Sequence, residues 1–255
     1  MSFPIAFKCE LLKTKRTSVV YLAMIAAVIV PFLMMLFKAE EPGEFQKLSK
    51  DPWYLCYEDA GQPIAILFLP LFIILITSLV PQLEHRNNTW KQVLASPQTK
   101  FNIYFSKFLI IQLLILLFLV MHNLYMVLSV MGVHHLRNDI NIYDHGMNWD
   151  WFFRFNGNLY LSVLGISAIQ FWLGVRFRNF IVPLAIGFGL LMIGILLVGA
   201  YNWPHGDKYP FAFSLMLYVS KFKDYAFLIW SSLTYAIVFS AIGFWDFVRR
   251  RKIGG

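Results

Sequence analysis

The chain has 255 residues, of which 58% are hydrophobic, 18% are aromatic and only 14% are charged. Because soluble domains carry about 25% charged residues, this composition excludes an ordinary soluble protein and predicts a membrane protein. The net charge of +8 does not indicate a nucleic-acid partner, since the basic residues lie in short segments beside apolar runs, where lipid headgroups and topology rules place them.

Residues 1–17 are predicted to form an interfacial helix. Phe3, Phe7 and Leu11 recur at intervals of four, while Lys8 and Lys13 lie on other faces, a pattern typical of a helix that lies along a membrane surface. The alternative is a simple basic flank to the first span. The apolar run that follows has membrane length and no cleavage site behind it, so we expect it to remain as an anchor.

Six apolar runs have about the length that crosses the hydrocarbon core of a bilayer, roughly 30 Å at 1.5 Å per residue. The predicted fold is therefore an all-α polytopic membrane protein, with residues 1–255 forming one transmembrane domain. The six spans are expected at about 19–37, 63–83, 108–133, 159–175, 180–201 and 225–248.

The distribution of charge predicts the orientation. The two ends of the chain, the loop after span two and the loop after span four together hold 14 basic and three acidic residues. The segments on the other side hold 8 basic and 11 acidic residues. Because cytoplasmic segments carry the excess of Lys and Arg, we expect the N- and C-termini to be cytosolic.

The polar segment 84–98, between spans two and three, is predicted to contain a short amphipathic helix. Thr89 and Gln92 fit a capping box, in which each side chain pairs with a backbone group of the first turn, and Pro97 ends the helix because it has no N–H. Such a helix is either a docking surface for a partner or a loop that lies on lipid headgroups. Its apolar face comprises Trp90, Val93 and Leu94, with Glu84, Arg86 and Lys91 around it.

The segments on the opposite side differ from one another. Residues 38–61 are predicted to form an acidic surface loop, and residues 134–158 a solvated loop that contains three histidines. These histidines lack the spacing of paired ligands on a helix, so no metal site is predicted. Residues 209–220 are mostly apolar but too few to span, which predicts a re-entrant or interfacial segment before span six.

Four polar residues lie inside the predicted spans. Polar groups in a bilayer usually face the bundle interior or a water-filled cavity, so they are candidates for the lining of a substrate path. The alternative is hydrogen bonding between helices. The four are Gln112, His122, Asn123 and Gln170.

No catalytic motif is present. The sequence contains neither the G-x-x-x-x-G-K-[ST] loop that binds nucleotide phosphates nor an H-E-x-x-H zinc motif. Ser167 together with His122 would be the nucleophile and base of a stand-alone membrane hydrolase, which is an alternative of a different class. We therefore predict no catalytic residue, no metal and no cofactor bound by this chain.

Several stretches resemble the permease subunits of ABC-2 type exporters, most closely the small six-span permeases associated with lantibiotic and bacteriocin self-protection. The similar stretches are the FKCELLKTKRT opening, the E-x-x-x-x-T-W-K-x-x-L-A-S-P run of residues 84–97, Lys107 at the start of span three and the short turn at 176–179. The resemblance implies an exporter-like fold with an N-terminal interfacial helix, a cytosolic coupling helix between spans two and three, and a re-entrant segment before span six.

The resemblance also implies a function and partners. The chain would be a permease in a bacterial plasma membrane that moves a peptide, an antibiotic or a lipid-like molecule outward. ATP and Mg²⁺ would be bound by a separate ATP-binding subunit on the cytosolic side, in contact with segment 84–97, and a second permease copy or paralogue would complete the transporter. The remaining alternatives are a membrane enzyme and an immunity or scaffold protein that acts without ATP.

Overall fold

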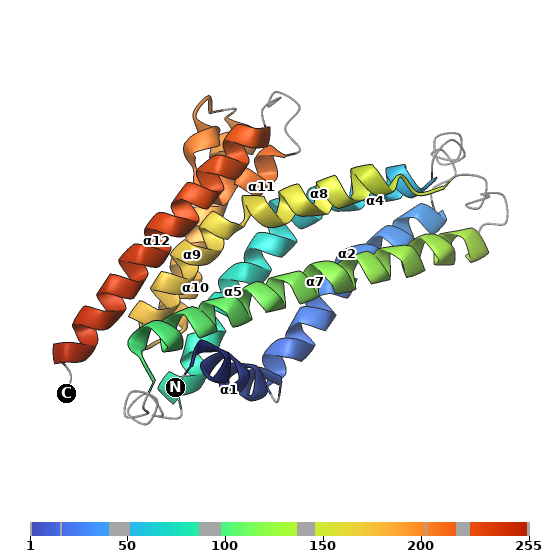
Figure 1. Ribbon diagram of the computed structural model, residues 1–255. Helices are drawn as coiled ribbons and strands as arrows, with labels where there is room; N and C mark the ends of the chain where they lie inside the picture. Colours follow the sequence, from blue (N-terminus) through green and yellow to red (C-terminus); the bar gives the residue numbers. More distant parts are fainter. Residues whose placement is uncertain are drawn as a thin grey trace.

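The computed structural model describes residues 2–15, 17–40, 52–86, 98–136, 146–201, 203–217 and 225–253. Within these ranges the regular structure is helical and no strand occurs. Six helical stretches are long and apolar enough to cross a membrane: Ser18–Lys38, Trp53–Glu84, Lys100–Leu136, Trp149–Arg176, Ile181–Ala200 and Tyr225–Arg249. The predicted all-α architecture with six spans is confirmed (Figure 1).

Nine longer helices make up most of the described chain, and shorter helical turns connect some of them. The π-helical turn η1 (Ile64–Phe68) joins α4 to α5, and η2 (Leu196–Ala200) extends α10. Two 3₁₀ turns, η3 (Gly206–Lys208) and η4 (Pro210–Ala212), and the short α11 (Phe213–Met216) precede the last span. The longer helices are α1 (Phe3–Lys15), α2 (Ser18–Glu40), α4 (Pro52–Pro63), α5 (Leu69–Arg86), α7 (Lys100–Leu136), α8 (Trp149–Ser162), α9 (Leu164–Arg176), α10 (Ile181–Ile195) and α12 (Tyr225–Ile253).

Two segments that the sequence assigned to loops are helical. Residues 52–61 form most of α4, where Cys56, Tyr57 and Ala60 are buried and Lys38 of α2 pairs with Asp59 at 2.8 Å. The start of α8 lies within the predicted loop 134–158, because the side chain of Asn148 accepts a hydrogen bond from the Trp151 N–H and so caps the helix. Spans two and four are therefore longer than the apolar runs in the sequence.

Helix α5 lies in the middle of the molecule, with α9 and α10 on one side and α7 and α2 on the other (Figure 1). Ile73, Ile74 and Ile76 on this helix are almost completely buried. Helix α9 approaches α5 so closely that a Cβ atom on Gly174 would overlap the backbone carbonyl of Thr77. This contact fixes the distance between the two spans.

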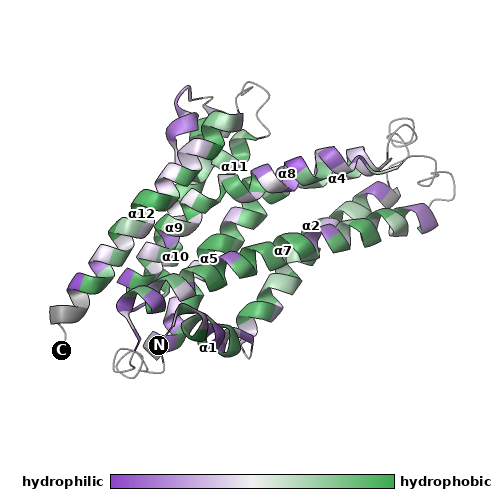
Figure 2. Ribbon diagram, viewed as in Figure 1, coloured by the Kyte–Doolittle hydropathy of each residue, from purple (hydrophilic) through white to green (hydrophobic). Residues whose placement is uncertain are grey.

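The two chain ends lie at the same end of the molecule, where α1 and the last turns of α12 are found (Figure 1). Hydrophobic residues dominate the central parts of the long helices, whereas α1 and the helix ends carry more hydrophilic ones (Figure 2). The described part of the predicted re-entrant segment, residues 209–217, consists of the short helices η4 and α11. Phe211, Phe213 and Met216 in this segment are buried within the protein.

Candidate functional site

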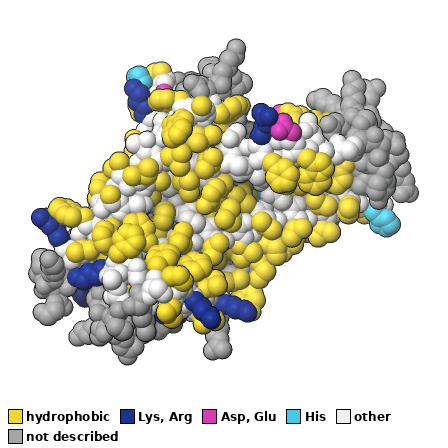
Figure 3. Space-filling model, in the orientation of Figure 1, with side chains coloured by type: hydrophobic (Ala, Val, Ile, Leu, Met, Phe, Trp, Pro, Cys, Tyr) yellow, Lys and Arg dark blue, Asp and Glu magenta, His cyan; other side chains and the backbone are white. Residues whose placement is uncertain are grey.

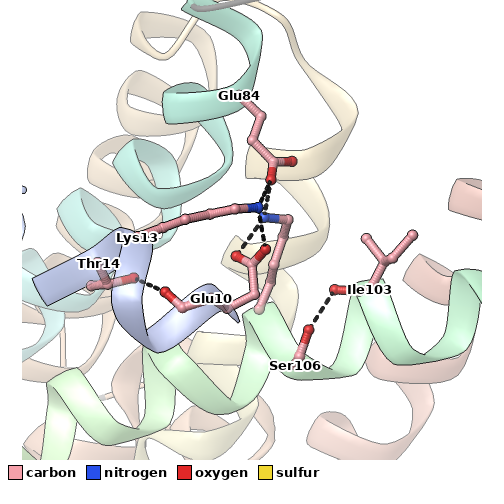
Figure 4. A network of polar contacts seen from close by, with 7 residues as sticks. Glu10, Lys13, Thr14, Glu84, Ile103 and Ser106 are labelled. Carbon is pink, nitrogen blue, oxygen red and sulfur yellow. Dashed lines mark hydrogen bonds and ion pairs between the residues drawn. The ribbon is translucent and has the colours of Figure 1, made fainter. Parts of the chain in front are cut away.

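Four charged side chains form a cluster at the end of the molecule that carries α1. We call Glu10, Lys13, Glu84 and Lys107 the charge cluster (Figure 4). The ammonium of Lys107 lies 2.7 Å from Glu10 Oε2 and 2.6 Å from Glu84 Oε1. The ammonium of Lys13 lies 2.7 Å from Glu10 Oε1 and 3.1 Å from Glu84 Oε1. Each carboxylate therefore accepts hydrogen bonds from both lysines.

Three members of the charge cluster are removed from solvent. Lys107 is 2% exposed, Glu84 4% and Glu10 8%, whereas the side chain of Lys13 is half exposed. Burying an isolated charge costs several kcal/mol, and a buried pair is stable only when each charge is well hydrogen-bonded. The four contacts between two carboxylates and two ammoniums, whose formal charges cancel, offset part of that cost.

The electrostatic surroundings shift the pKa values of the two α1 residues. Burial raises the pKa of Glu10, but the nearby Lys107 and Lys13 more than reverse this effect, so the pKa lies below 4.5. For Lys13, burial lowers the pKa, but Glu10 and Glu84 outweigh it and hold the pKa above 10.5. Both shifts favour the charged forms over a wide range around neutral pH.

Three helices supply the charge cluster. Glu10 and Lys13 come from α1, Glu84 from the last turn of α5 and Lys107 from the second turn of α7. The face of α1 that carries Ala6, Glu10 and Thr14 is buried and packs on α7. Its three residues recur at intervals of four. The sequence pattern had instead emphasised the neighbouring stripe of Phe3, Phe7 and Leu11, but Leu11 is exposed. The charge cluster therefore joins α1 to both helices that flank segment 87–97.

The predicted coupling residues are described only in part. Glu84 belongs to the charge cluster, and Arg86 is the last residue of α5, with its side chain outside the described part of the structure. The other predicted contact residues, Thr89, Trp90, Lys91, Val93, Leu94 and Pro97, lie outside the described residues. Contact between this segment and a partner remains a prediction.

The four predicted intramembrane polar residues do not form one cluster, and no hydrogen bond joins any two of them in the ranges described. The Gln112 amide donates to Ser167 Oγ at 3.0 Å, which links α7 to α9. Asn123 Nδ2 donates to Asn156 Oδ1 at 2.8 Å, which links α7 to α8. These two contacts favour the alternative interpretation, hydrogen bonding between helices, and a role in a substrate path stays a prediction.

Gln170 makes the same kind of contact. Its Nε2 donates to the Pro183 carbonyl at 2.6 Å and so links α9 to α10. Gly187, one turn after Pro183, makes room for this bond, since a Cβ atom there would overlap the Gln170 amide. Gln170 therefore also holds two helices together.

His122 is explained by a proline on the neighbouring helix. Pro31 in α2 has no N–H, so the Ala27 carbonyl one turn earlier lacks its usual helical partner. His122 of α7 is buried and lies within hydrogen-bonding reach of the Ala27 backbone. Ser129, two turns further along α7, donates to the Pro31 carbonyl at 2.8 Å. Ser129 therefore attaches α7 to α2 at the proline, and His122 lies near the Ala27 backbone, with its Nδ1 making no hydrogen bond among the described residues.

The hydrolase alternative needs Ser167 beside His122, and the structure pairs Ser167 differently. Its hydroxyl donates to the Leu164 carbonyl at 2.8 Å and accepts from Gln112. His122 is ten residues beyond Gln112 on the same helix, which is about 15 Å along the axis. Among the described residues, no group of three or more His, Cys, Asp or Glu side chains could hold a metal ion.

Sequence reasoning placed Glu84 in the coupling segment, Lys107 at the start of span three and Lys13 in the interfacial helix, but it did not predict that they meet Glu10 in one cluster. Glu10 is the one acidic residue among the first 39, and Lys107 is the last charged residue before a long apolar run. Both are unusual positions for a charged residue, and this is the signal by which the sequence could have indicated Glu10 and Lys107 as functional residues. Sequence separations of 71 and 97 residues in the pairs Lys13–Glu84 and Glu10–Lys107 lie beyond any helical periodicity.

One family model, described as ABC-2 family transporter protein, matches residues 6–194 of the chain. The match begins in α1, includes the whole charge cluster and segment 84–98, and ends near the C-terminus of α10. No curated protein matches the chain.

Proposed function

The chain belongs to the ABC-2 transporter family, and on that premise we propose that it is the transmembrane permease subunit of an ATP-driven exporter. The substrate class proposed is a peptide, an antibiotic or a lipid-like molecule, as in self-protection against bacteriocins. A separate ATP-binding subunit binds ATP and Mg²⁺ on the cytosolic side. A second permease, identical or paralogous, completes the transporter in a bacterial plasma membrane.

The single observation that best supports this mechanism is the position of the charge cluster. Glu84 and Lys107 lie 2.6 Å apart at the two ends of the connection that carries the predicted coupling helix. In the proposed orientation, the ATP-binding subunit contacts this connection through Trp90, Val93 and Leu94.

The charge cluster would make the connected helices move together. If α5 were displaced alone, Glu84 would leave both lysines and become a buried, uncompensated charge, which costs about 3–5 kcal/mol. If α7 were displaced alone, Lys107 would leave both carboxylates. A force on segment 84–98 therefore moves α5, α7 and α1 as one unit, because separating them is the costlier response.

Two alternatives make different predictions. A stand-alone hydrolase would depend on Ser167, whose hydroxyl is already engaged with Gln112 and Leu164. An immunity or scaffold protein that works without ATP would retain its activity in cells that lack the ATP-binding subunit. The proposed exporter would lose its activity in such cells.

The experiment that tests the proposal is purification of the chain from its native membranes, followed by mass spectrometry to detect a copurified ATP-binding protein. We expect the unmodified chain to retain that protein, and Trp90→Ala with Leu94→Ala to lose it while the permease stays folded. The matched control is Trp230→Ala with Ile237→Ala, which also removes one tryptophan and one aliphatic side chain, from the exposed surface of α12. Full retention and full transport by the Trp90/Leu94 variant would contradict the docking assignment.

A further inference from the structure

A cavity of about 510 Å³ that is open to the surface of the molecule lies between α7 and α8, with Tyr57 of α4 in its lining. Most of its lining is aliphatic or aromatic, and it contains no charged side chain. Its volume falls in the range of roughly 300–1,000 Å³ that is typical of small-molecule sites. The surface on this side of the molecule is largely hydrophobic (Figure 3).

Depth along α7 places the cavity in one leaflet. Asn123, which lines it, is sixteen residues beyond Lys107 and so about 24 Å further along the helix. Lys107 belongs to the charge cluster beside α1, and the hydrocarbon core is roughly 30 Å thick. The cavity therefore lies in the half of the bilayer farther from α1, which is the outer leaflet in the orientation proposed above.

Two asparagines and two tyrosines in the lining already use their side-chain donors. The amide N–H groups of Asn123 and Asn156 bond to each other's side chains and to carbonyls one turn earlier in their own helices. The Tyr57 hydroxyl donates to the Asn123 carbonyl at 3.2 Å and the Tyr160 hydroxyl to Gln112 at 3.3 Å. These four residues therefore offer neither a charge nor a spare donor to an anionic headgroup, and the remaining side-chain N–H in the lining is that of Trp149, which is 60% exposed.

Other occupants fit poorly. A buried water needs about two to four polar partners, more than these engaged side chains offer. An empty recess would deprive its lining of dispersion contacts. A flexible hydrocarbon chain satisfies the volume, the polarity and the depth together.

We propose that this cavity binds one acyl chain of a membrane lipid from the leaflet farther from α1. The headgroup stays outside at the membrane surface, and the chain packs between α7 and α8 beside the Asn123–Asn156 pair. This inference goes beyond the transport proposal, because binding requires neither ATP nor the partner subunit.

The test uses the full-length chain in lipid nanodiscs that contain phosphatidylcholine with a photoreactive diazirine on its acyl chain. After illumination, mass spectrometry locates the cross-linked residues. We expect the α7 and α8 residues that line the cavity to be labelled about tenfold more than exposed residues of α10. Equal labelling of both surfaces would overturn the proposal, as would weaker labelling of the cavity than of α10, which is the result expected if a second copy of the chain covers the cavity.

A pair of glycine variants provides the matched control. Gly157 lines the cavity, and nothing lies within 4 Å of a Cβ atom built there, so Gly157→Leu fills the space without moving the backbone. Gly189 on α10 is equally open but outside the cavity. We expect Gly157→Leu to lower labelling of the cavity about tenfold and Gly189→Leu to leave it unchanged. Unchanged labelling in Gly157→Leu would also overturn the proposal.

Discussion

Lys107 shows how one side chain can set the relation between three helices. It is almost completely buried, and its ammonium contacts one carboxylate from α1 and one from α5. Without both carboxylates its burial would cost several kcal/mol. The positions of α1 and α5 relative to α7 therefore depend on the side chains of the charge cluster and on their charges.

Replacing Lys107 should be strongly destabilising. Lys107→Met leaves Glu10 and Glu84 buried with only the half-exposed Lys13 between them, so we expect the free energy of unfolding to fall by about 3–5 kcal/mol. The measurement is reversible unfolding of the purified chain in mixed micelles. Lys8→Met, at an exposed position of α1, should change stability by less than about 0.5 kcal/mol. Similar losses in the two variants would show that the charge cluster contributes little.

The charge cluster also predicts a pH dependence. Because the pKa of Glu10 is lowered from 4.5, its contribution to stability is complete above about pH 4.5 and is lost as the pH falls through the folded-state pKa. The pKa of Lys13 is raised from 10.5, so its contribution is present below about pH 10.5 and is lost as the pH rises through the folded-state value.

Unfolding measured from about pH 7 down to pH 3 checks the acid limb. We expect stability to decrease more steeply in the unmodified chain than in Glu10→Gln, which cannot titrate at this position. Parallel curves for the two proteins would mean that Glu10 has the same pKa in the folded and unfolded states.

At the scale of elements, periodicity and apolar length predicted the number of spans but not their full extent. Helix α7 has 37 residues, or about 56 Å at 1.5 Å per residue, well beyond the roughly 30 Å core. The sequence did not predict the extra helical turns at the ends of α4, α7 and α8, because those turns contain polar residues. Hydropathy detects apolar segments and does not detect helix that continues into polar sequence. The burial of α4 arises from packing against α2 and α7, which a local pattern does not contain.

The close contact between α5 and α9 predicts that adding a single methyl group at Gly174 lowers stability. Gly174→Ala places a Cβ atom against the Thr77 carbonyl, so we expect a loss of about 1–3 kcal/mol as the helices separate. Gly189→Ala has open space and should be neutral, or stabilising by up to about 1 kcal/mol through helix propensity. Thermal unfolding of both variants checks this pair. If Gly174→Ala is as stable as Gly189→Ala, the close approach does not determine the packing of these spans.

For the candidate site, the sequence identified the segment but not the charge cluster that anchors it. Glu84 was found because it opens a motif with a cap and a stop, both of which are local features. Its partners come from α1 and α7, and only the folded chain brings them together. The four intramembrane polar residues were found by their chemistry, and their separate hydrogen bonds between helices depend on which helices are neighbours.

At the scale of the whole molecule, the described part of the chain has an even number of candidate spans, which returns the chain to the side where it began. Both chain ends accordingly lie at one end of the bundle (Figure 1). That end also carries the charge cluster and the larger share of the basic residues. The positive-inside rule predicts that this end faces the cytosol. In that orientation the proposed contact between segment 84–98 and an ATP-binding subunit would be cytosolic, and the proposed acyl-chain cavity would lie in the opposite leaflet.

The most direct test of this account is the side of the membrane on which residue 91 is accessible. In a chain with Cys9 and Cys56 replaced by alanine, Lys91→Cys is treated with a membrane-impermeant maleimide, in intact cells and in inside-out vesicles. The account predicts labelling in the vesicles and none in the intact cells. Labelling of Lys91→Cys in intact cells would place segment 84–98 outside the cytosol, where no ATP-binding subunit could drive it.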